Sequence, residues 1–309
     1  MDARTKANPN ANANVNVNVN VKIGRQRLTR SAVAGATGVV LCLSVTTVPA
    51  RTPTSAGARR YAPVNGLQLY YEIHGVADAR TPPLVLLHGG GSSIETSFAD
   101  ALPLLSKHRQ VIAFDQQGHG RTADIPDRPF TFEQSADDTA ALLRYLKVER
   151  ADLLGFSNGG SIALQVAIRH PQLVRKLIVA SAMYKRDGLA PGFWQAMQHA
   201  RPENMSAALR ESYQRIAPHP DQLRSFHDKS AHRMLDFKDW KADDIRGIAA
   251  PTLLLVGDHD VIRPEHTVEM FRLLPHGEMA VFPGTDHAAI PRRLAEQAAV
   301  LEAFLDSGH

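Results

Sequence analysis

Short runs of mostly apolar residues recur along most of the chain after residue 60. They lie at 84–87, 111–114, 152–154, 177–180, 252–256 and 279–282. A strand covered by helices on both faces has no solvent-facing side, so its sequence is apolar throughout instead of alternating. The runs therefore predict a mostly parallel sheet. Residues 67–73, after the turn Asn65-Gly66, are predicted to add an edge hairpin strand.

Segments with helical spacing lie between these strands. Residues 131–147 have apolar side chains at helical intervals, and Thr131 with Gln134 matches the pattern of a capping box. A second helical pattern begins at Asn158. Parallel strands need crossover connections of a dozen or more residues, and most of the intervals are long enough to supply them. We therefore predict an α/β fold with a doubly wound sheet.

The interval 183–246 breaks this alternation, because it contains no convincing strand. Its aromatic and methionine side chains are spread among polar residues, as expected for several helices. Ligands of open α/β sheets bind at the carboxyl ends of the strands, so an insertion here predicts a helical cap over a binding site. An ordinary peripheral helical layer is the alternative. The candidates for lining an apolar substrate pocket are Trp194, Met197, Met205 and Tyr213, although each could instead belong to the core of the cap.

The positive charge of the chain is concentrated near its N-terminus. The net charge is +4, but the first fifty residues hold six Lys or Arg and one Asp, which leaves 29 basic and 30 acidic residues after them. A nearly neutral remainder gives no support for a nucleic-acid partner. Residues 10–21 alternate Asn with Ala or Val, a low-complexity composition that predicts a disordered tail.

Residues 22–50 have the layout of an export signal. A basic region at 22–30 precedes an uncharged stretch at 31–50, and cleavage after Ala50, Ala56 or Ala58 would satisfy the preference for small residues. We therefore expect a periplasmic or secreted protein. An uncleaved membrane anchor is the alternative, because about twenty residues can span a bilayer.

These features divide the chain into residues 1–58, tail plus signal or anchor, and residues 59–309, one domain with a cap at about 183–246. The only cysteine, Cys42, lies in the first part. A cleaved protein would then contain no disulfide, no reactive thiolate and no cysteine-based metal site.

The segment Gly155-Phe156-Ser157-Asn158-Gly159 lies between a predicted strand and a predicted helix. It matches G-x-S-x-G, in which a sharp strand-to-helix turn exposes the serine hydroxyl. Glycine is needed on both sides because a side chain would collide with the turn or with the neighbouring strand. A serine hydroxyl is a weak nucleophile, so its use requires a base that takes the proton and an acid that orients the base.

Suitable partners follow two later strands. Gly257-Asp258-His259-Asp260 comes after the run 252–256, and Thr285-Asp286-His287 comes shortly after the run 279–282. The order Ser, Asp, His along the chain is the one expected when a nucleophile elbow is present.

Four motifs in order, LHGGG, GFSNG, GDHD and GTDH, resemble the α/β-hydrolase superfamily over about residues 61–306. The resemblance implies that Ser157 is the nucleophile, Asp260 the orienting acid and His287 the general base. The family usually places the acid at the second Asp of a Gly-Asp-x-Asp turn, so Asp258 is expected to cap the turn.

A serine nucleophile also needs donors for the oxyanion that forms during attack. The backbone N–H of Asn158, the residue after the nucleophile, is expected to be one donor. The glycine loop after the run 84–87 is expected to supply the second, from Gly90 or alternatively from Gly91.

We therefore expect hydrolysis of a small carboxylic ester or lactone through an acyl-serine, with no metal or organic cofactor. A serine nucleophile argues against a haloalkane dehalogenase, whose counterpart is aspartate. Carbon–carbon bond hydrolases, amidases and cofactor-free haloperoxidases resemble the same pattern and remain alternatives, as does a receptor that binds ligand without turnover. The remaining histidines fit no metal-ligand spacing and are expected on the surface; they include His199, His219, His227, His232, His259, His266 and His276.

Overall fold

The structure is a computed structural model that describes residues 60–78 and 80–308. The predicted export signal or anchor, its cleavage sites and Cys42 lie outside the described residues, so they stay predictions. Within the described part of the chain, no helix is both long and apolar enough to cross a membrane.

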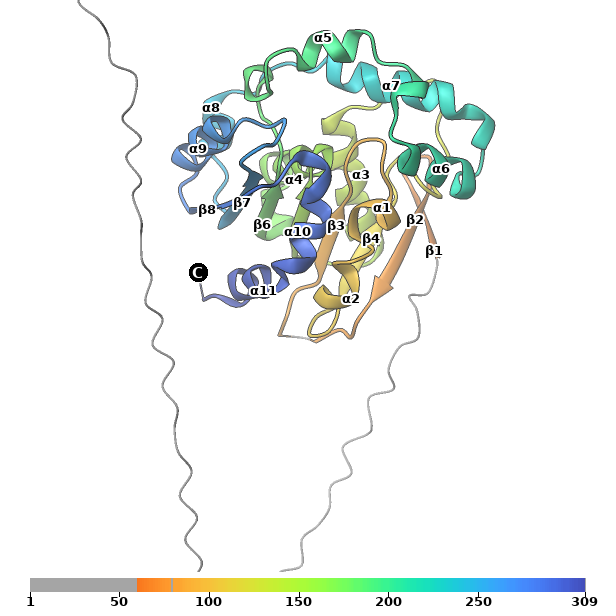
Figure 1. The fold of residues 1–309 in the computed structure, drawn as a ribbon. Helices are drawn as coiled ribbons and strands as arrows, with labels where there is room; N and C mark the ends of the chain where they lie inside the picture. Colours follow the sequence, from red (N-terminus) through yellow and green to blue (C-terminus); the bar gives the residue numbers. More distant parts are fainter. Residues whose placement is uncertain (1–59, 79, 309) are drawn as a thin grey trace, which may run out of the picture. The chain divides into compact units, whose positions relative to one another are not determined.

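An eight-stranded sheet forms the centre of the domain (Figure 1), in the order β1-β2-β4-β3-β5-β6-β7-β8. Only the pairs β1–β2 and β2–β4 are antiparallel, and all other neighbours are parallel. This arrangement confirms the predicted α/β fold with a mostly parallel sheet. The strands are β1 (Arg60–Val64), β2 (Leu67–His74), β3 (Leu84–Leu87), β4 (Val111–Phe114), β5 (Ala151–Phe156), β6 (Val174–Ala180), β7 (Thr252–Gly257) and β8 (Gly277–Phe282).

The prediction of an edge strand at residues 67–73 was wrong in its position within the sheet. The strand exists as β2, but β2 lies between β1 and β4, and β1 occupies the edge. Asn65 and Gly66 join the two strands with φ values of 48° and 81°. Positive φ at both turn residues is typical of a tight two-residue hairpin, which brings β1 alongside β2.

Helices cover both faces of the sheet. They are α1 (Ile94–Phe98), α2 (Leu102–Leu105), α3 (Phe132–Tyr145), α4 (Asn158–Arg169), α5 (Phe193–Gln198), α6 (Ala207–Ile216), α7 (Leu223–Leu235), α8 (Ala242–Arg246), α9 (Pro264–Leu273), α10 (Ile290–Glu296) and α11 (Ala298–Asp306). Helix α3 begins where the sequence predicted, with the Thr131 hydroxyl accepting a hydrogen bond from the Gln134 amide at 3.0 Å. The Gln134 side chain does not complete the predicted capping box, because it donates to Asp138 instead.

Strand β3 shows why the apolar runs are unbroken. Val85 and Leu87 pack into the cluster that contains side chains of α3 and α4, whereas Leu84 and Leu86 pack into the cluster that contains those of α1, α2, α10 and α11. All four side chains are fully buried. Successive strand residues point to opposite faces, so both sets of side chains in a strand covered on two faces lie in a core, which favours apolar residues along its whole length.

The interval between β6 and β7 contains helices and short 3-10 turns, and no named strand lies within its described residues. Figure 1 shows α5, α6 and α7, here called the inserted helices, gathered at one end of the sheet. The 3-10 turns of this interval are η2 (Arg186–Gly188), η3 (Pro202–Asn204) and η4 (Pro220–Gln222).

The two ends of this insertion are fastened to each other. The Trp240 amide donates to the Tyr184 carbonyl at 2.9 Å, and the Arg186 amide donates to Asp239 Oδ1 at 2.7 Å. The Arg186 guanidinium also donates to the Leu235 carbonyl, at the C-terminal end of α7, at 3.1 Å. The chain therefore enters and leaves the insertion at one point.

Candidate active site

Ser157 lies at the sharp turn between β5 and α4. Its φ and ψ are 56° and −123°, a backbone conformation that non-glycine residues rarely adopt. A Cβ on Gly155 would lie 2.2 Å from the Gly159 carbonyl oxygen, and a Cβ on Gly159 would lie 2.0 Å from the Leu87 oxygen. Both distances are far below van der Waals contact, so the turn can form only with glycine on each side of the serine.

A chain of hydrogen bonds connects the three residues implied by the sequence. His287 Nε2 lies 2.9 Å from Ser157 Oγ, and His287 Nδ1 lies 2.7 Å from Asp260 Oδ1. Asp260 follows β7, and His287 begins the 3-10 turn η5 (His287–Ala289) after β8. Because β5, β7 and β8 run parallel in one sheet, residues far apart in the sequence meet at its carboxyl edge. A carboxylate can only accept, so His287 Nδ1 is the donor to Asp260 and Nε2 is left to accept from Ser157.

The Asp260 carboxylate is fully buried and has three donors. Besides His287, the Ser181 hydroxyl donates to Oδ2 at 2.6 Å and the Ile262 amide donates to Oδ1 at 3.0 Å. Burial raises the pKa of this carboxyl, but the hydrogen bond and charge interaction with His287, together with the other two donors, outweigh it. The pKa of Asp260 consequently lies below its ordinary value.

Ser181 was not identified from the sequence. It follows the last residue of β6 with a φ of 52°, and this backbone conformation directs its hydroxyl at Asp260. Its position in the sequence could have identified it, because a polar residue directly after a buried strand lies at the same edge of the sheet as Ser157.

Asp258 has a different position from Asp260. It accepts a hydrogen bond from the Thr285 amide at 3.0 Å, which joins the loop after β7 to the loop after β8. Backbone hydrogen bonds from Thr285 and Gly284 are the main cause that lowers the pKa of Asp258 to about 2. This carboxylate holds the turn together and does not contact His287 by any hydrogen bond among the described residues.

Candidate oxyanion donors lie beside Ser157. Within the described residues, the backbone amides of Gly90, Gly91 and Asn158 donate to no other group, and all three residues line one cavity with Ser157. A Cβ on Gly90 would lie 2.3 Å from the Asn158 side-chain nitrogen, so a larger residue at position 90 would require the Asn158 side chain to move. Asn158 also begins α4, whose dipole favours negative charge at this end.

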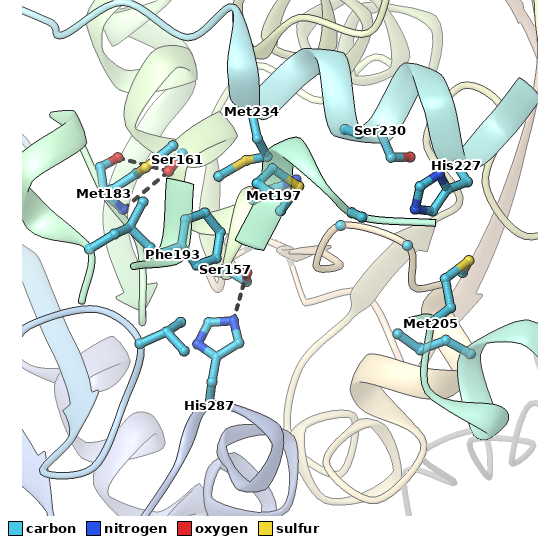
Figure 2. Close-up of a pocket in the computed structure, with 18 of the residues that line it drawn as sticks. Ser157, Ser161, Met183, Phe193, Met197, Met205, His227, Ser230, Met234 and His287 are labelled. Carbon is cyan, nitrogen blue, oxygen red and sulfur yellow. Dashed lines mark hydrogen bonds between the residues drawn. The ribbon is translucent and has the colours of Figure 1, made fainter. Parts of the chain in front are cut away.

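The cavity has a volume of about 360 Å³, and His287 lies in its wall. Figure 2 shows apolar side chains in the wall of the cavity, with Met197 near Ser157 and Met205 nearer His227. Sequence reasoning missed several other residues of this wall: Met183, Leu189, Phe193, Leu209, Phe226, His227, Ser230, Met234, Val261 and Ile262.

The predicted pocket residues Trp194 and Tyr213 do not line this cavity, so that prediction was wrong for these two. Trp194 turns to the base of the insertion, where its Nε1 donates to the Arg186 carbonyl at 2.9 Å and the Arg186 guanidinium lies 3.7 Å from its ring centre. Tyr213 stacks on Phe226 with ring centres 4.5 Å apart. Phe226 lines the cavity and Tyr213 lies behind it.

Two histidines predicted at the surface are buried instead. His266 is 3 % exposed and stacks on Tyr184, and burial is the main cause that lowers the pKa of His266 to about 4. His227 is 8 % exposed and faces the cavity. Among the residues that the structure describes, no group of three or more His, Cys, Asp or Glu is arranged to hold a metal ion.

Several known proteins with similar sequences are named as hydrolases. A family model described as "alpha/beta hydrolase fold" matches residues 82–225. A protein of Serratia proteamaculans named "Putative carbamate hydrolase RutD" is 30% identical over 244 residues, which are 71% of this chain and 89% of that protein. The 2-hydroxy-6-oxo-2,4-heptadienoate hydrolase of Pseudomonas putida is 30% identical over 227 residues, 66% of this chain and 82% of its own.

Among solved structures, the enol-lactonase of Burkholderia xenovorans matches with a TM-score of 0.64 and 24% identity, over 80% of this chain and 100% of its own. At this identity the match concerns the fold alone. The same fold is indicated by the order of the strands, by the sequence relatives and by the structural match. The chain belongs to the α/β hydrolase family.

Proposed function

We propose that the protein is a serine hydrolase that cleaves a small carboxylic ester or lactone through an acyl-serine intermediate. One observation carries the proposal: the hydrogen-bonded chain Asp260–His287–Ser157 ends at a serine hydroxyl in the wall of an apolar cavity. Such an arrangement supplies a nucleophile, a base and an orienting acid in the order that acyl transfer requires.

In the acylation step, Ser157 Oγ attacks the carbonyl carbon while His287 Nε2 takes the hydroxyl proton. The carbonyl oxygen becomes an oxyanion, and the amides of Asn158 and Gly90 are placed to stabilise it, with Gly91 as the alternative to Gly90. Removing one such donor costs about 3 kcal/mol of transition-state stabilisation, because a preorganised amide needs no reorientation during the reaction. Asp260 stabilises the imidazolium and remains ionised.

The tetrahedral intermediate collapses when His287 gives its proton to the leaving oxygen, which departs as an alcohol. In a lactone this alcohol stays attached to the acyl group. A water molecule then loses a proton to His287 Nε2 and attacks the acyl carbon. When this second intermediate collapses, the proton returns to Ser157 Oγ and the carboxylic acid is released.

A carbon–carbon bond hydrolase is the second candidate. The observation that favours it is the 30% identity to the 2-hydroxy-6-oxo-2,4-heptadienoate hydrolase of Pseudomonas putida. The same nucleophile, base and oxyanion donors act on a ketone carbonyl, with carbon as the leaving atom. We favour ester or lactone hydrolysis because this reaction forms no departing carbanion, so the cavity needs no further group to stabilise one.

A substrate panel applied to the wild type and two variants tests the proposal. We expect the wild type to hydrolyse short 4-nitrophenyl esters, and Ser157→Ala to reduce kcat to the residual level that binding and the oxyanion donors alone support. Ser225→Ala, an exposed serine on α7, is the matched control and should behave as wild type. Lactones, carbamates, amides and 2-hydroxy-6-oxo-2,4-heptadienoate complete the panel. Equal ester turnover by Ser157→Ala and wild type would exclude the mechanism, and turnover of the dienoate alone would select the second candidate.

We also propose that residues 1–58 direct export, from the basic and uncharged segments of the sequence. N-terminal sequencing of the protein from the expressing cells should begin at Arg51, Gly57 or Arg59. A membrane-associated protein with an intact N-terminus would favour the anchor instead.

A further inference from the structure

The cavity has a polar group at a distance from the candidate catalytic residues. Figure 2 shows His227 beside Ser230, on α7, well away from the Ser157–His287 contact. Most other residues around the cavity are apolar, and four of them are methionines. His227 is therefore one of the minority of polar side chains in this wall, which also include Arg201 and Asn204, and its hydrogen bonds decide what it can bind.

The hydrogen bonds of His227 fix the role of each nitrogen. Nδ1 lies 3.2 Å from Asp228 Oδ1, and a carboxylate can only accept, so Nδ1 carries the proton. In the neutral ring, Nε2 is then an acceptor. It receives no hydrogen bond from the described residues, although the side chain is more than nine-tenths buried.

Ser230 adds a second acceptor at the same place. Its hydroxyl donates to the Phe226 carbonyl one helical turn earlier, at 2.8 Å, so its hydrogen is engaged and its remaining lone pair is free to accept. Two neighbouring acceptors match a ligand group that brings its own hydrogen. A ligand hydroxyl at this place can donate to either acceptor.

We propose that His227 Nε2, with Ser230 Oγ, accepts a hydrogen bond from a hydroxyl group at the far end of the substrate. The substrate class is thus an ester or lactone whose apolar segment separates the cleaved carbonyl from a terminal hydroxyl. This inference rests on the proposed hydrolase function, and it adds a recognition site to it. A purely apolar wall cannot distinguish a hydroxyl strongly from a methyl group, whereas a wall with a fixed acceptor can.

Matched ester pairs test the recognition site. The substrates are 4-nitrophenyl esters of unbranched acids with four to ten carbons, each with and without a hydroxyl on the terminal carbon, and a third set ending in a carboxylate. We expect the hydroxyl to raise kcat/KM relative to the unsubstituted ester at one chain length, where it reaches His227, and at no other. In His227→Phe, the hydroxyl-to-methyl ratio at that length should fall by about 10- to 100-fold.

His232→Phe is the matched control, because His232 lies on the same helix, is exposed and does not line this cavity. It should keep the wild-type ratio. An unchanged ratio in His227→Phe, or the same hydroxyl effect at every chain length, would overturn the recognition site. A larger gain for the terminal carboxylate than for the hydroxyl would overturn the acceptor role of Nε2, because an acceptor repels an anion.

A binding measurement separates this inference from the proposed function. Methyl ketones with and without a terminal hydroxyl contain no ester bond, and calorimetry with Ser157→Ala measures their affinity without turnover. Hydroxyl-dependent binding that disappears in the variant Ser157→Ala/His227→Phe supports the site even if no ester is cleaved. Equal affinities for the two ketones at every length would refute the site, whether or not esters are hydrolysed.

Discussion

The backbone at Ser157 predicts that glycine at this position stabilises the protein more than alanine does. Both Ser157→Ala and Ser157→Gly remove the hydroxyl and its contact with His287, so that loss cancels in the comparison. What differs is the backbone. With φ at 56° and ψ at −123°, a residue with a Cβ is strained, and glycine is not.

The magnitude follows from two opposing terms. A non-glycine residue in a sparsely populated region of φ and ψ costs about 1–3 kcal/mol. Glycine also has more backbone freedom in the unfolded chain than alanine. The loss of this freedom on folding lowers the free energy of unfolding of Ser157→Gly by about 0.4–1 kcal/mol. We therefore expect Ser157→Gly to exceed Ser157→Ala in free energy of unfolding by about 0.5–2 kcal/mol, while both variants hydrolyse esters only at the residual level.

Urea unfolding of the two variants, followed by circular dichroism, measures the difference directly. The same pair at Ser161, within helix α4, is the control, because alanine should there be more stable than glycine by about 1 kcal/mol. The sign of the difference should reverse between the two positions. Ser157→Ala equal to or more stable than Ser157→Gly would refute the reasoning that strain is stored at this turn.

Further predictions concern the residues around Ser157. Asp260→Asn should lower kcat by about 10⁴-fold, because the amide favours the wrong His287 tautomer, whereas Asp258→Asn should leave kcat near the wild-type value in the same ester assay. Because the pKa of Asp258 is lowered to about 2, its contribution to stability is complete above the ordinary pKa of 3.8 and is lost as pH falls towards 2; acid unfolding of wild type and Asp258→Asn should converge there. Ser181→Gly removes one donor to Asp260 without straining the backbone, so kcat should fall about 10-fold and the loss of activity at low pH should begin at a higher pH than in wild type. An unchanged pH profile would show that Ser181 has no such role. Met197→Ala should change the ranking of acyl chain lengths at nearly constant melting temperature, whereas Trp194→Ala should lower the melting temperature and keep the ranking; the reverse result would contradict the placement of these two side chains.

The fold and the residues at the ends of strands could be predicted because each depends on local chemistry. An apolar run identifies a buried strand without knowledge of its partners, and parallel strands present their carboxyl ends at one edge. Ser157, Asp260 and His287 each follow such a run, so their meeting required no knowledge of side-chain packing. The position of β2 was less accessible, because the hairpin turn specifies that β1 and β2 pair but not which of them lies at the edge.

The wall of the cavity could not be predicted in the same way. Helix α5 has only six residues, too few for a periodic pattern to distinguish its faces, so Trp194 and Met197 were equivalent candidates although only Met197 reaches the cavity. His227 stands in a polar stretch between Phe226 and Asp228, and nothing nearby in the sequence indicates burial. Such assignments depend on how the inserted helices pack on the sheet, which is a long-range property.

The joined ends of the insertion bear on how new selectivity could arise in this protein. Tyr184 and Trp240 are fixed to each other by a backbone hydrogen bond, so the loop between them is already closed by its own contacts. The entropy of closing a loop increases only slowly with its length, by about 0.6 kcal/mol for each doubling. Residues 188–190 of this interval also pair with the loop after β7, since the Ala190 amide donates to the Val261 carbonyl at 2.8 Å and the Arg263 amide donates to the Gly188 carbonyl at 2.9 Å. Segments of different length and composition could therefore replace the rest of the interval if residues 184–190 and Trp240 are kept. A graft between relatives within these limits would exchange the preference for substrate and leave the acyl-transfer residues in place, so most of the insertion is a unit that recombination can move.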